Sequence, residues 1–478
     1  MRVSRLITAV PILILTLALA GVATAQSASE LSPDVLEYVA VDAPVVALTH
    51  VRVVDGTGAA PAENRTILIE NGLITAVGAD GEVDIPAGAE VLALNGHTVI
   101  PGIVGLHDHT FYTNAGRRVQ LSYSAPRLYL GSGVTTIRTT GSYHPYSEIN
   151  LDAAIESGQS PGPRMYITGP YLTGPAGSGY MTAVATPEDA RRIVNYWAEE
   201  GVDWFKAYTR ISPEALEAAI DEAHRHGLKF TGHLCSVSFQ EAVAMGIDNL
   251  EHGFFTNTDY YPGREMGECP NDLWPSLIEV DIQGDAVQAT FQDMIENDVP
   301  MTSTLAVYEL YYPGRPPVEQ RMLDALAPAV RDDYLAAHEQ IAANAASSVM
   351  PELFHKAQAF ERAFVEAGGL LGAGVDPTGN GGALPGFGDQ RNYELLIEAG
   401  FTPVEAIEIM TANGARVLGE YNDFGSIEPG KSADLVVIEG NPIANPAGIR
   451  NVTLVFKEGV GYDSAKLIDA VDGMVGIR

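Results

Sequence analysis

The stretch Val99-Ile-Pro-Gly-Ile-Val-Gly-Leu-His-Asp-His109 is an apolar run that ends in a His-x-His pair. Such a run is typical of a buried strand, and residues two apart on a strand project from the same face. His107 and His109 can therefore hold one metal ion together. The stretch predicts a buried strand whose end is a metal site.

Similar apolar runs follow this stretch, and amphipathic helical patterns separate them. The runs cover residues 134–140, 164–169, 202–209, 228–235, 247–253, 301–307 and 370–376. With the first strand they make eight strand-and-helix units between residues 99 and 418. This alternation predicts an α/β fold, a (β/α)8 TIM barrel whose active site lies at the C-terminal ends of the strands.

Short β patterns flank the predicted barrel on both sides. We expect residues 26–98 and 419–478 to form a small composite β-sandwich domain beside a barrel of residues 99–418. Two connections, 254–298 and 308–350, are longer than ordinary barrel loops, and the second contains a helical pattern from 318 to 346. Insertions of this kind often shape the mouth of an active site.

The N-terminus has the three parts of a secretory signal peptide, so residues 1–25 are excluded from the fold and the mature protein is expected to be secreted or periplasmic. No later run reaches the roughly 18 apolar residues of a membrane span, so no membrane insertion is expected after cleavage. Loss of Arg2 and Arg5, with no acid lost, moves the formal net charge from −33 to about −35. Nucleic acid is therefore excluded as a partner. The acidic residues either form a solvated surface, the simpler interpretation, or attract cationic substrates.

Six residues that can bind metal lie at or near the ends of the predicted strands. They are His107, His109, Lys206, His233, His252 and Asp376. Each alone could be a structural residue, but all of them fall at the edge of the barrel where an active site is expected. Together they predict a metal-binding site, with neutral imidazoles and a carboxylate as ligands that suit zinc.

The two cysteines leave two interpretations open. An oxidising compartment permits a disulfide between Cys235 and Cys269, although nothing in the sequence requires one. Cys235 follows His233 by two residues and could face the site. A small buried thiol that fills a layer of the barrel is the favoured interpretation.

Five motifs together resemble the amidohydrolase superfamily over nearly the whole mature chain. They are Pro101-Gly-Ile-Val-Gly-Leu-His-Asp-His109, Thr231-Gly-His233, Leu250-Glu-His-Gly253, Gly374-Val-Asp376 and Gly430-Lys-Ser-Ala-Asp-Leu-Val-Val437. Lys206 resembles the lysine of the branch that carries a carboxylated lysine between two divalent metals. Prolidase-like dipeptidases, carboxypeptidases and ochratoxinase-type amidases belong to that branch.

The resemblance implies two divalent metal ions, with zinc expected, and a carbamate formed from CO2 on Lys206. It assigns His107, His109 and Asp376 to one metal, His233 and His252 to the other, and N6-carboxylated Lys206 to both. Asp376 is then the catalytic residue, which accepts a proton from the activated water and delivers it to the leaving amine. One departure concerns strand two, where many relatives carry Asp after Thr135-Thr-Ile-Arg138 and this chain carries Thr139.

Four residues just beyond the strand ends are candidates for substrate binding. They are Tyr143, His144, Tyr208 and Arg391. An arginine there can bind a substrate carboxylate through two hydrogen bonds, although Arg391 could equally cap a helix or pair with an acid. Tyr208 lies two residues after Lys206 and shares its strand face.

These observations predict an exported, binuclear, metal-dependent amidohydrolase that cleaves an amide bond, in a dipeptide or an N-acyl amino acid. The partner is a small molecule or short peptide, and a homo-oligomer is compatible with the sequence. Alternatives on the same site are a lactonase or cyclic amidase and an imidazolonepropionase-like or deaminase activity. A catalytically silent metal-binding barrel protein is the alternative outside enzymes.

Overall fold

The computed structural model describes residues 28–114, 116–177 and 179–477. The predicted signal peptide, residues 1–25, lies outside the described residues. In the described part of the chain, no helix combines the length and the apolar character needed to cross a membrane.

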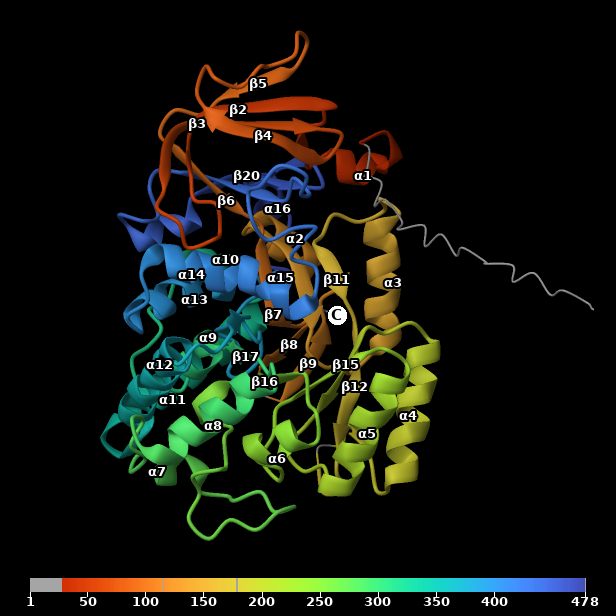
Figure 1. The fold of residues 1–478 in the computed structure, drawn as a ribbon, viewed down its shortest axis with the longest axis vertical. Helices are drawn as coiled ribbons and strands as arrows, with labels where there is room; N and C mark the ends of the chain where they lie inside the picture. Colours follow the sequence, from red (N-terminus) through yellow and green to blue (C-terminus); the bar gives the residue numbers. More distant parts are fainter. Residues whose placement is uncertain (1–27, 115, 178, 478) are drawn as a thin grey trace, which may run out of the picture.

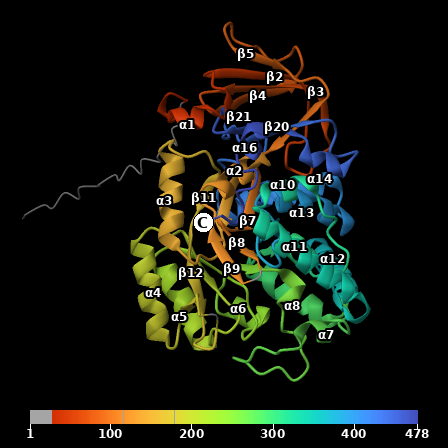
Figure 2. The same ribbon diagram turned by 180° about the vertical axis from the view of Figure 1, so that it is seen from behind.

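Both ends of the chain contribute strands to one sheet at one end of the molecule. Its strands in the described residues are β1 (Val39–Val41), β2 (Val45–Val53), β3 (Ala62–Glu70), β4 (Leu73–Ala79), β5 (Glu90–Ala93), β6 (His97–Pro101), β19 (Leu435–Glu439), β20 (Val452–Lys457) and β21 (Val460–Asp463). Strand β6 joins the two ends, because it pairs with β2 on one side and with β19 on the other. Figures 1 and 2 show strands β2–β5 beside β20 at the top of both views. Val46, Leu48, Ile67 and Leu435 belong to a separate hydrophobic core in this sheet.

The central part of the chain forms the predicted barrel. Its strands are β7 (Ile103–Asp108), β10 (Val134–Thr139), β11 (Arg164–Tyr166), β12 (Thr168–Thr173), β14 (Trp204–Ala207), β15 (Lys229–Gly232), β16 (Asn249–Glu251), β17 (Met301–Ser303) and β18 (Leu371–Ala373). Strands β11 and β12 share the third position, since β11 pairs with β10 and β12 with β14. Neighbouring strands are parallel. The backbone N–H of Asp376 donates to His107 O (2.7 Å), which links the chain after β18 to β7. The predicted fold class is confirmed.

The run Val99–His109 differs from its predicted form, because it contains two strands rather than one. Val99 to Pro101 belong to β6 of the composite sheet, and the barrel strand β7 begins only at Ile103. Gly102 lies between them, where a Cβ atom would stand 2.0 Å from Thr135 Oγ1. The strand therefore leaves one sheet and enters the other at a glycine that packs closely against strand β10.

Helices surround the barrel and connect its strands. They are α2 (Ser124–Gly131), α3 (Pro145–Glu156), α4 (Pro187–Glu199), α5 (Pro213–Arg225), α6 (Phe239–Ala244), α7 (Leu273–Leu277), α8 (Asp285–Glu296), α9 (Leu305–Glu309), α10 (Gln320–Ala325), α11 (Pro328–Ala343), α12 (Met350–Glu366), α13 (Phe387–Glu398), α14 (Pro403–Met410) and α15 (Ala412–Leu418). Two further helices belong to the chain ends: α1 (Pro33–Leu36) precedes β1, and α16 (Ser464–Asp469) follows β21. Helices α4, α5 and α14 begin alike: a Thr or Ser side chain accepts an N–H bond and a proline follows it, which suits a helix start.

The helical pattern at 318–346 was predicted as one helix and is two. Helix α10 ends at Ala325, and α11 begins at Pro328. Proline has no N–H to donate within a helix and disfavours helical geometry in the residue before it, so the helix divides there. The other predicted insertion holds α7 and α8. Short strands β8 (Phe111–Asn114) and β9 (Arg117–Gln120) form a hairpin after β7, and β13 (Thr182–Ala183) pairs with β12.

Candidate metal centre

All six predicted metal-binding residues lie at the C-terminal ends of barrel strands. Lys206 is in β14 and His107 in β7, while the other four follow the ends of their strands. The side chains meet because the strands of a parallel barrel end at the same edge.

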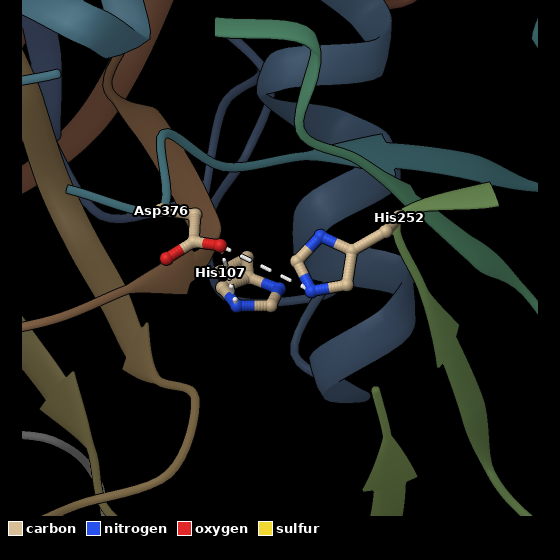
Figure 3. Close-up of side chains that lie close together, drawn as sticks. All are labelled: His107, His252 and Asp376. Carbon is tan, nitrogen blue, oxygen red and sulfur yellow. Dashed lines mark ion pairs between the residues drawn. The ribbon is translucent and has the colours of Figure 1, made fainter. Parts of the chain in front are cut away.

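Asp376 lies at the centre of this group. Its Oδ1 atom is 3.4 Å from His109 Nε2, and its Oδ2 atom is 3.6 Å from His107 Nε2 and 4.0 Å from His252 Nε2. Figure 3 shows His107, His252 and Asp376 turned toward one another. One ligand atom from each of these three buried residues lies within 4.8 Å of the other two. The arrangement is that of a potential metal site.

Lys206 and His233 lie beside the same three residues. Lys206 Nζ donates to His107 Nε2 (3.0 Å), and the ring centres of His233 and His252 are 4.3 Å apart. Burial lowers the pKa of Lys206 to about 8. Burial also lowers the pKa of His109 to about 4 and of His233 to about 3. These histidines are therefore neutral at pH 7, as metal binding requires.

A layer of buried polar residues orients His107. Glu251 Oε2 accepts a hydrogen bond from His107 Nδ1 (2.7 Å), which leaves the Nε2 lone pair to face Asp376 and Lys206. Glu251 Oε1 accepts from Arg138 Nη2, Thr231 Oγ1 and Asn249 Nδ2. Burial alone would raise the pKa of Glu251, but the positive charge of Arg138 and the contact with His107 outweigh it and hold the pKa low. A permanent negative charge thus supports the imidazole from behind.

His252 is oriented in a similar way. Its Nδ1 atom lies 2.7 Å from Thr304 Oγ1, and its Nε2 atom is buried with no hydrogen-bond partner among the described residues. A buried nitrogen without a partner is costly in a folded protein, unless a ligand such as a metal ion satisfies it. The unsatisfied Nε2 and the nearby carboxylate oxygens form a donor set that fits a divalent metal.

Two residues of the site have a left-handed backbone conformation that residues other than glycine rarely adopt. The φ angles are 69° at His252 and 48° at Asp376. Such conformations carry a cost and concentrate at functional sites. Gly374, two residues before Asp376, must be a glycine, because a Cβ atom there would stand 2.2 Å from the backbone N of His107.

A cavity of about 630 Å³ opens above these residues. His107, Lys206, His233 and Asp376 line its floor. Seven aromatic side chains of the described residues contribute to the walls: Tyr143, Tyr171, Tyr208, Phe255, Trp274, Tyr308 and Tyr311. Tyr171 OH lies 3.2 Å from His109 Nε2, so the aromatic wall reaches the candidate metal-binding residues. A cavity of this size and lining suits a small organic molecule.

The four predicted substrate residues divide into two pairs. Tyr143 and Tyr208 line the cavity. His144 is exposed before α3 and does not line it. Arg391 also lies elsewhere: its guanidinium pairs with Glu309 (2.7 Å) and Glu394. The prediction that Arg391 binds a substrate carboxylate is replaced by the alternative, a pairing with neighbouring acids.

The cysteines are joined, which corrects the favoured interpretation of Cys235 as a buried free thiol. Cys235 and Cys269 form a disulfide. Cys235 also lines the cavity, and so do Pro270, Asn271 and Trp274 near Cys269. The bond therefore fastens the insertion after β16 to the end of β15, next to His233.

Sequence reasoning missed the residues that support the ligands and most of the cavity wall. Glu251 lies in the motif Leu250-Glu-His-Gly253, directly before His252. A carboxylate beside a candidate metal-binding histidine is a pattern from which its supporting role could have been predicted. Arg138 belongs to the strand-two motif Thr135-Thr-Ile-Arg138, but that motif does not indicate that its guanidinium pairs with Glu251. Arg118 and Trp274, which come from a hairpin and an insertion, carry no comparable signal because their positions depend on loop folding.

Comparisons with known proteins agree with this geometry. The pattern of the Amidohydrolase family matches residues 98–263 and 333–461. An imidazolonepropionase of Geobacillus kaustophilus (strain HTA426) is 26% identical over 407 residues, which cover 78% of this chain and 84% of that protein. A candidate prolidase from Bifidobacterium longum has a TM-score of 0.65 and 27% identity, over 89% of this chain and 98% of that chain.

A Xaa-Pro dipeptidase structure with bound methionine has a TM-score of 0.65 at 20% identity, over 88% of this chain and all of the other, and shows the likeness of fold. The family match covers more than half of the sequence and includes the strand ends that carry the clustered residues. The chain belongs to the amidohydrolase family and is a hydrolase of carbon–nitrogen bonds.

Proposed function

We propose that this protein is an exported binuclear amidohydrolase that cleaves the amide bond of a dipeptide or an N-acyl amino acid. The observation that carries the proposal is the position of Lys206, whose Nζ lies 3.0 Å from His107 Nε2 among buried metal-binding residues. An ammonium group cannot bind metal, whereas a carbamate on the same nitrogen offers two anionic oxygens. Export is supported by the Cys235–Cys269 disulfide, since such bonds persist in oxidising compartments.

We assign the six residues to two metal ions, as the family resemblance implies. His107, His109 and Asp376 would hold one, His233 and His252 the other, and carboxylated Lys206 both. When bound, two divalent metals activate a water molecule and polarise the scissile carbonyl. Zinc is the expected metal, because neutral imidazole and carboxylate ligands suit it.

Asp376 moves the proton in the proposed reaction. Its carboxylate lies in the cavity floor and accepts a hydrogen bond from Thr378 Oγ1 (2.9 Å), which holds one oxygen in place. Burial would raise the pKa of Asp376, but His107 and His109 outweigh it and keep the group ionised. The carboxylate accepts a proton from the attacking water and then delivers it to the leaving nitrogen. The amide bond breaks, and a carboxylate and an amine are released.

A lactonase or cyclic amidase could use the same cavity floor. Imidazolonepropionase-like activity is the second candidate, because several curated relatives carry that name. Lys206 favours the binuclear amidase over that alternative.

The test measures metal per chain and turnover for protein prepared with bicarbonate. The panel holds dipeptides, N-acyl amino acids, lactones and cyclic amides, with Lys206→Ala and Asp376→Asn as variants. We expect close to two metals in the wild type, and amide cleavage that falls at least about 10³-fold in both variants. Lys229→Ala is the matched control, because this lysine on strand β15 bonds the carbonyls of Val417 and Leu418, away from the metal-binding residues.

One metal or none per wild-type chain, or metal-independent turnover, would overturn the binuclear proposal. Turnover of lactones or cyclic amides without linear amides would replace the substrate class and leave the metal site. A Lys229→Ala variant that also lost metal would show that the assay reports folding instead of ligation.

A further inference from the structure

The cavity lining has a charge balance opposite to that of the whole chain. The sequence holds 61 acidic and 28 basic residues. Among the described residues that line the cavity, the only carboxylate is Asp376, and the cationic side chains are Lys206, Arg117 and Arg118. Lys206 and Asp376 belong to the metal-binding group. The rest of the lining therefore holds two arginines and no carboxylate, and an arginine there that is not paired with an acid would favour an anionic group on the ligand.

The two arginines of the lining differ in their partners. Arg117 Nη2 lies 3.0 Å from Asp333 Oδ2, so its charge is paired. Arg118 makes no ion pair with a carboxylate among the described residues, and its Nε atom is buried without a hydrogen-bond partner there. Its guanidinium instead lies 3.4 Å from the ring centre of Tyr180 and 5.4 Å from that of Tyr143.

This packing holds the guanidinium in place, while its Nε–H stays without a hydrogen-bond partner among the described residues. The Tyr180 ring contacts the guanidinium, and a side-chain hydrogen bond joins Arg118 to Tyr143, whereas a carboxylate binds an arginine edge through two parallel hydrogen bonds. Arg118 is half-buried, so water competes less for its donors than at an exposed arginine. The side chain is prepared to receive a planar anion.

An aromatic wall connects Arg118 to the metal-binding residues. The ring of Tyr143 lies 5.1 Å from that of Tyr171, whose hydroxyl is 3.2 Å from His109 Nε2. A ligand that lies along these two rings reaches the arginine at one end and the cavity floor at the other. The ring faces would contact a large apolar group on that ligand.

We propose that Arg118 binds the free carboxylate of the substrate and so selects N-acyl or N-aminoacyl amino acids that have a large apolar side chain. The inference rests on the proposed amide hydrolysis and names the residue that decides among its substrates. Arg118 takes the role predicted for Arg391, which is paired with Glu309 and Glu394. Neutral amides, lactones and cationic peptides without a free carboxylate are poor substrates for this cavity.

The test compares N-acetylphenylalanine with its carboxamide, by acetate release from the metal-loaded enzyme. The wild type is expected to prefer the free acid by at least about tenfold in kcat/KM. Arg118→Gln should lower kcat/KM for the acid roughly 10- to 100-fold, mostly through KM, and change that for the carboxamide less than about threefold. Arg118→Lys should fall between, because an ammonium keeps the charge and loses the planar fork. Arg117→Gln is the matched control and should leave the acid-to-amide ratio unchanged.

Binding of the same two compounds separates this inference from the proposed reaction. Calorimetry on Asp376→Asn protein, with and without Arg118→Gln and at the same measured metal content, gives affinity without turnover. Tighter binding of the acid that disappears with Arg118→Gln supports the inference, even if the wild type hydrolyses neither compound and the proposed reaction fails. Equal binding of acid and carboxamide, or a preference for the acid that survives Arg118→Gln, overturns it.

Discussion

Two buried glutamates show how differently the barrel interior and its outer layer treat a negative charge. Glu251, at the end of β16, contacts Arg138 and His107, and its pKa is held low although burial opposes this. Glu361, on α12 outside the barrel, accepts a hydrogen bond from Ser303 Oγ (2.8 Å), and burial raises its pKa to about 8. Glu251 is ionised and Glu361 is protonated at pH 7. A buried carboxylate keeps its charge only where partners are supplied, and here they are supplied behind His107 of the candidate metal centre.

The largest effect is expected when the ionised glutamate of the barrel interior, Glu251, is replaced. Glu251→Gln leaves Arg138 as an unpaired buried cation and removes the anion behind His107, so we expect a loss of about 3–5 kcal/mol in the free energy of unfolding. Bound metal should also fall, because the tautomer and orientation of His107 are no longer fixed. Urea unfolding with chelator present measures the first effect, and metal per chain the second.

Glu361→Gln is the matched control for that substitution, because it changes the same atoms in the other region. It should keep its metal and should not destabilise the protein to the same degree. Equal losses of stability and metal in both variants would mean that the charge of Glu251 has no special role.

A smaller effect is expected when the disulfide that joins the cavity wall to the end of β15 is removed. Replacement of Cys235 and Cys269 by Ala removes a disulfide between residues 34 positions apart. The free energy of unfolding should fall by roughly 3 kcal/mol. The wall near Trp274 should loosen and raise KM, while metal per chain stays at the wild-type value. Metal loss in this variant would contradict the view that strand ends alone position the ligands.

The smallest expected effect is a pH dependence of the free energy of unfolding that comes from Glu361 and not from Glu251. Burial raises the pKa of Glu361, so the folded state keeps a proton that the unfolded state has already released. The free energy of unfolding therefore falls as the pH rises toward about 8, and this loss is complete above that pH. Between pH 7 and 9 the wild type should lose about 1 kcal/mol from this group. Glu361→Gln should remove that part of the slope, as measured by urea unfolding at both pH values. An unchanged slope would show that Glu361 is ionised in both states.

The sequence predicted the barrel and the group of residues that gather at its strand ends for the same reason. Apolar runs that alternate with amphipathic helices leave few architectures, and a parallel barrel brings the ends of its strands to one edge. His233 and His252 therefore converge although each is unremarkable alone. The division of Val99–His109 between two sheets was not predictable from apolar character, because both strands are equally hydrophobic and only the packing of Gly102 separates them.

By itself the sequence determined the fold class, the family resemblance and the residues that gather at the strand ends. A short-range apolar pattern specifies the strands, and a parallel barrel then brings their C-terminal ends together. The tertiary structure alone decided which charges are paired. It joined Glu251 to His107, 144 residues away, placed Arg391 against Glu309, left Arg118 in the cavity wall and linked Cys235 to Cys269. Glu251 and His107 meet because β16 and β7 belong to the same closed barrel, and Arg391 meets Glu309 where helix α13 packs near α9. The places of Arg118 and Cys269 depend on how a hairpin and an insertion fold back over the barrel. The spacing of residues along the chain encodes none of these contacts.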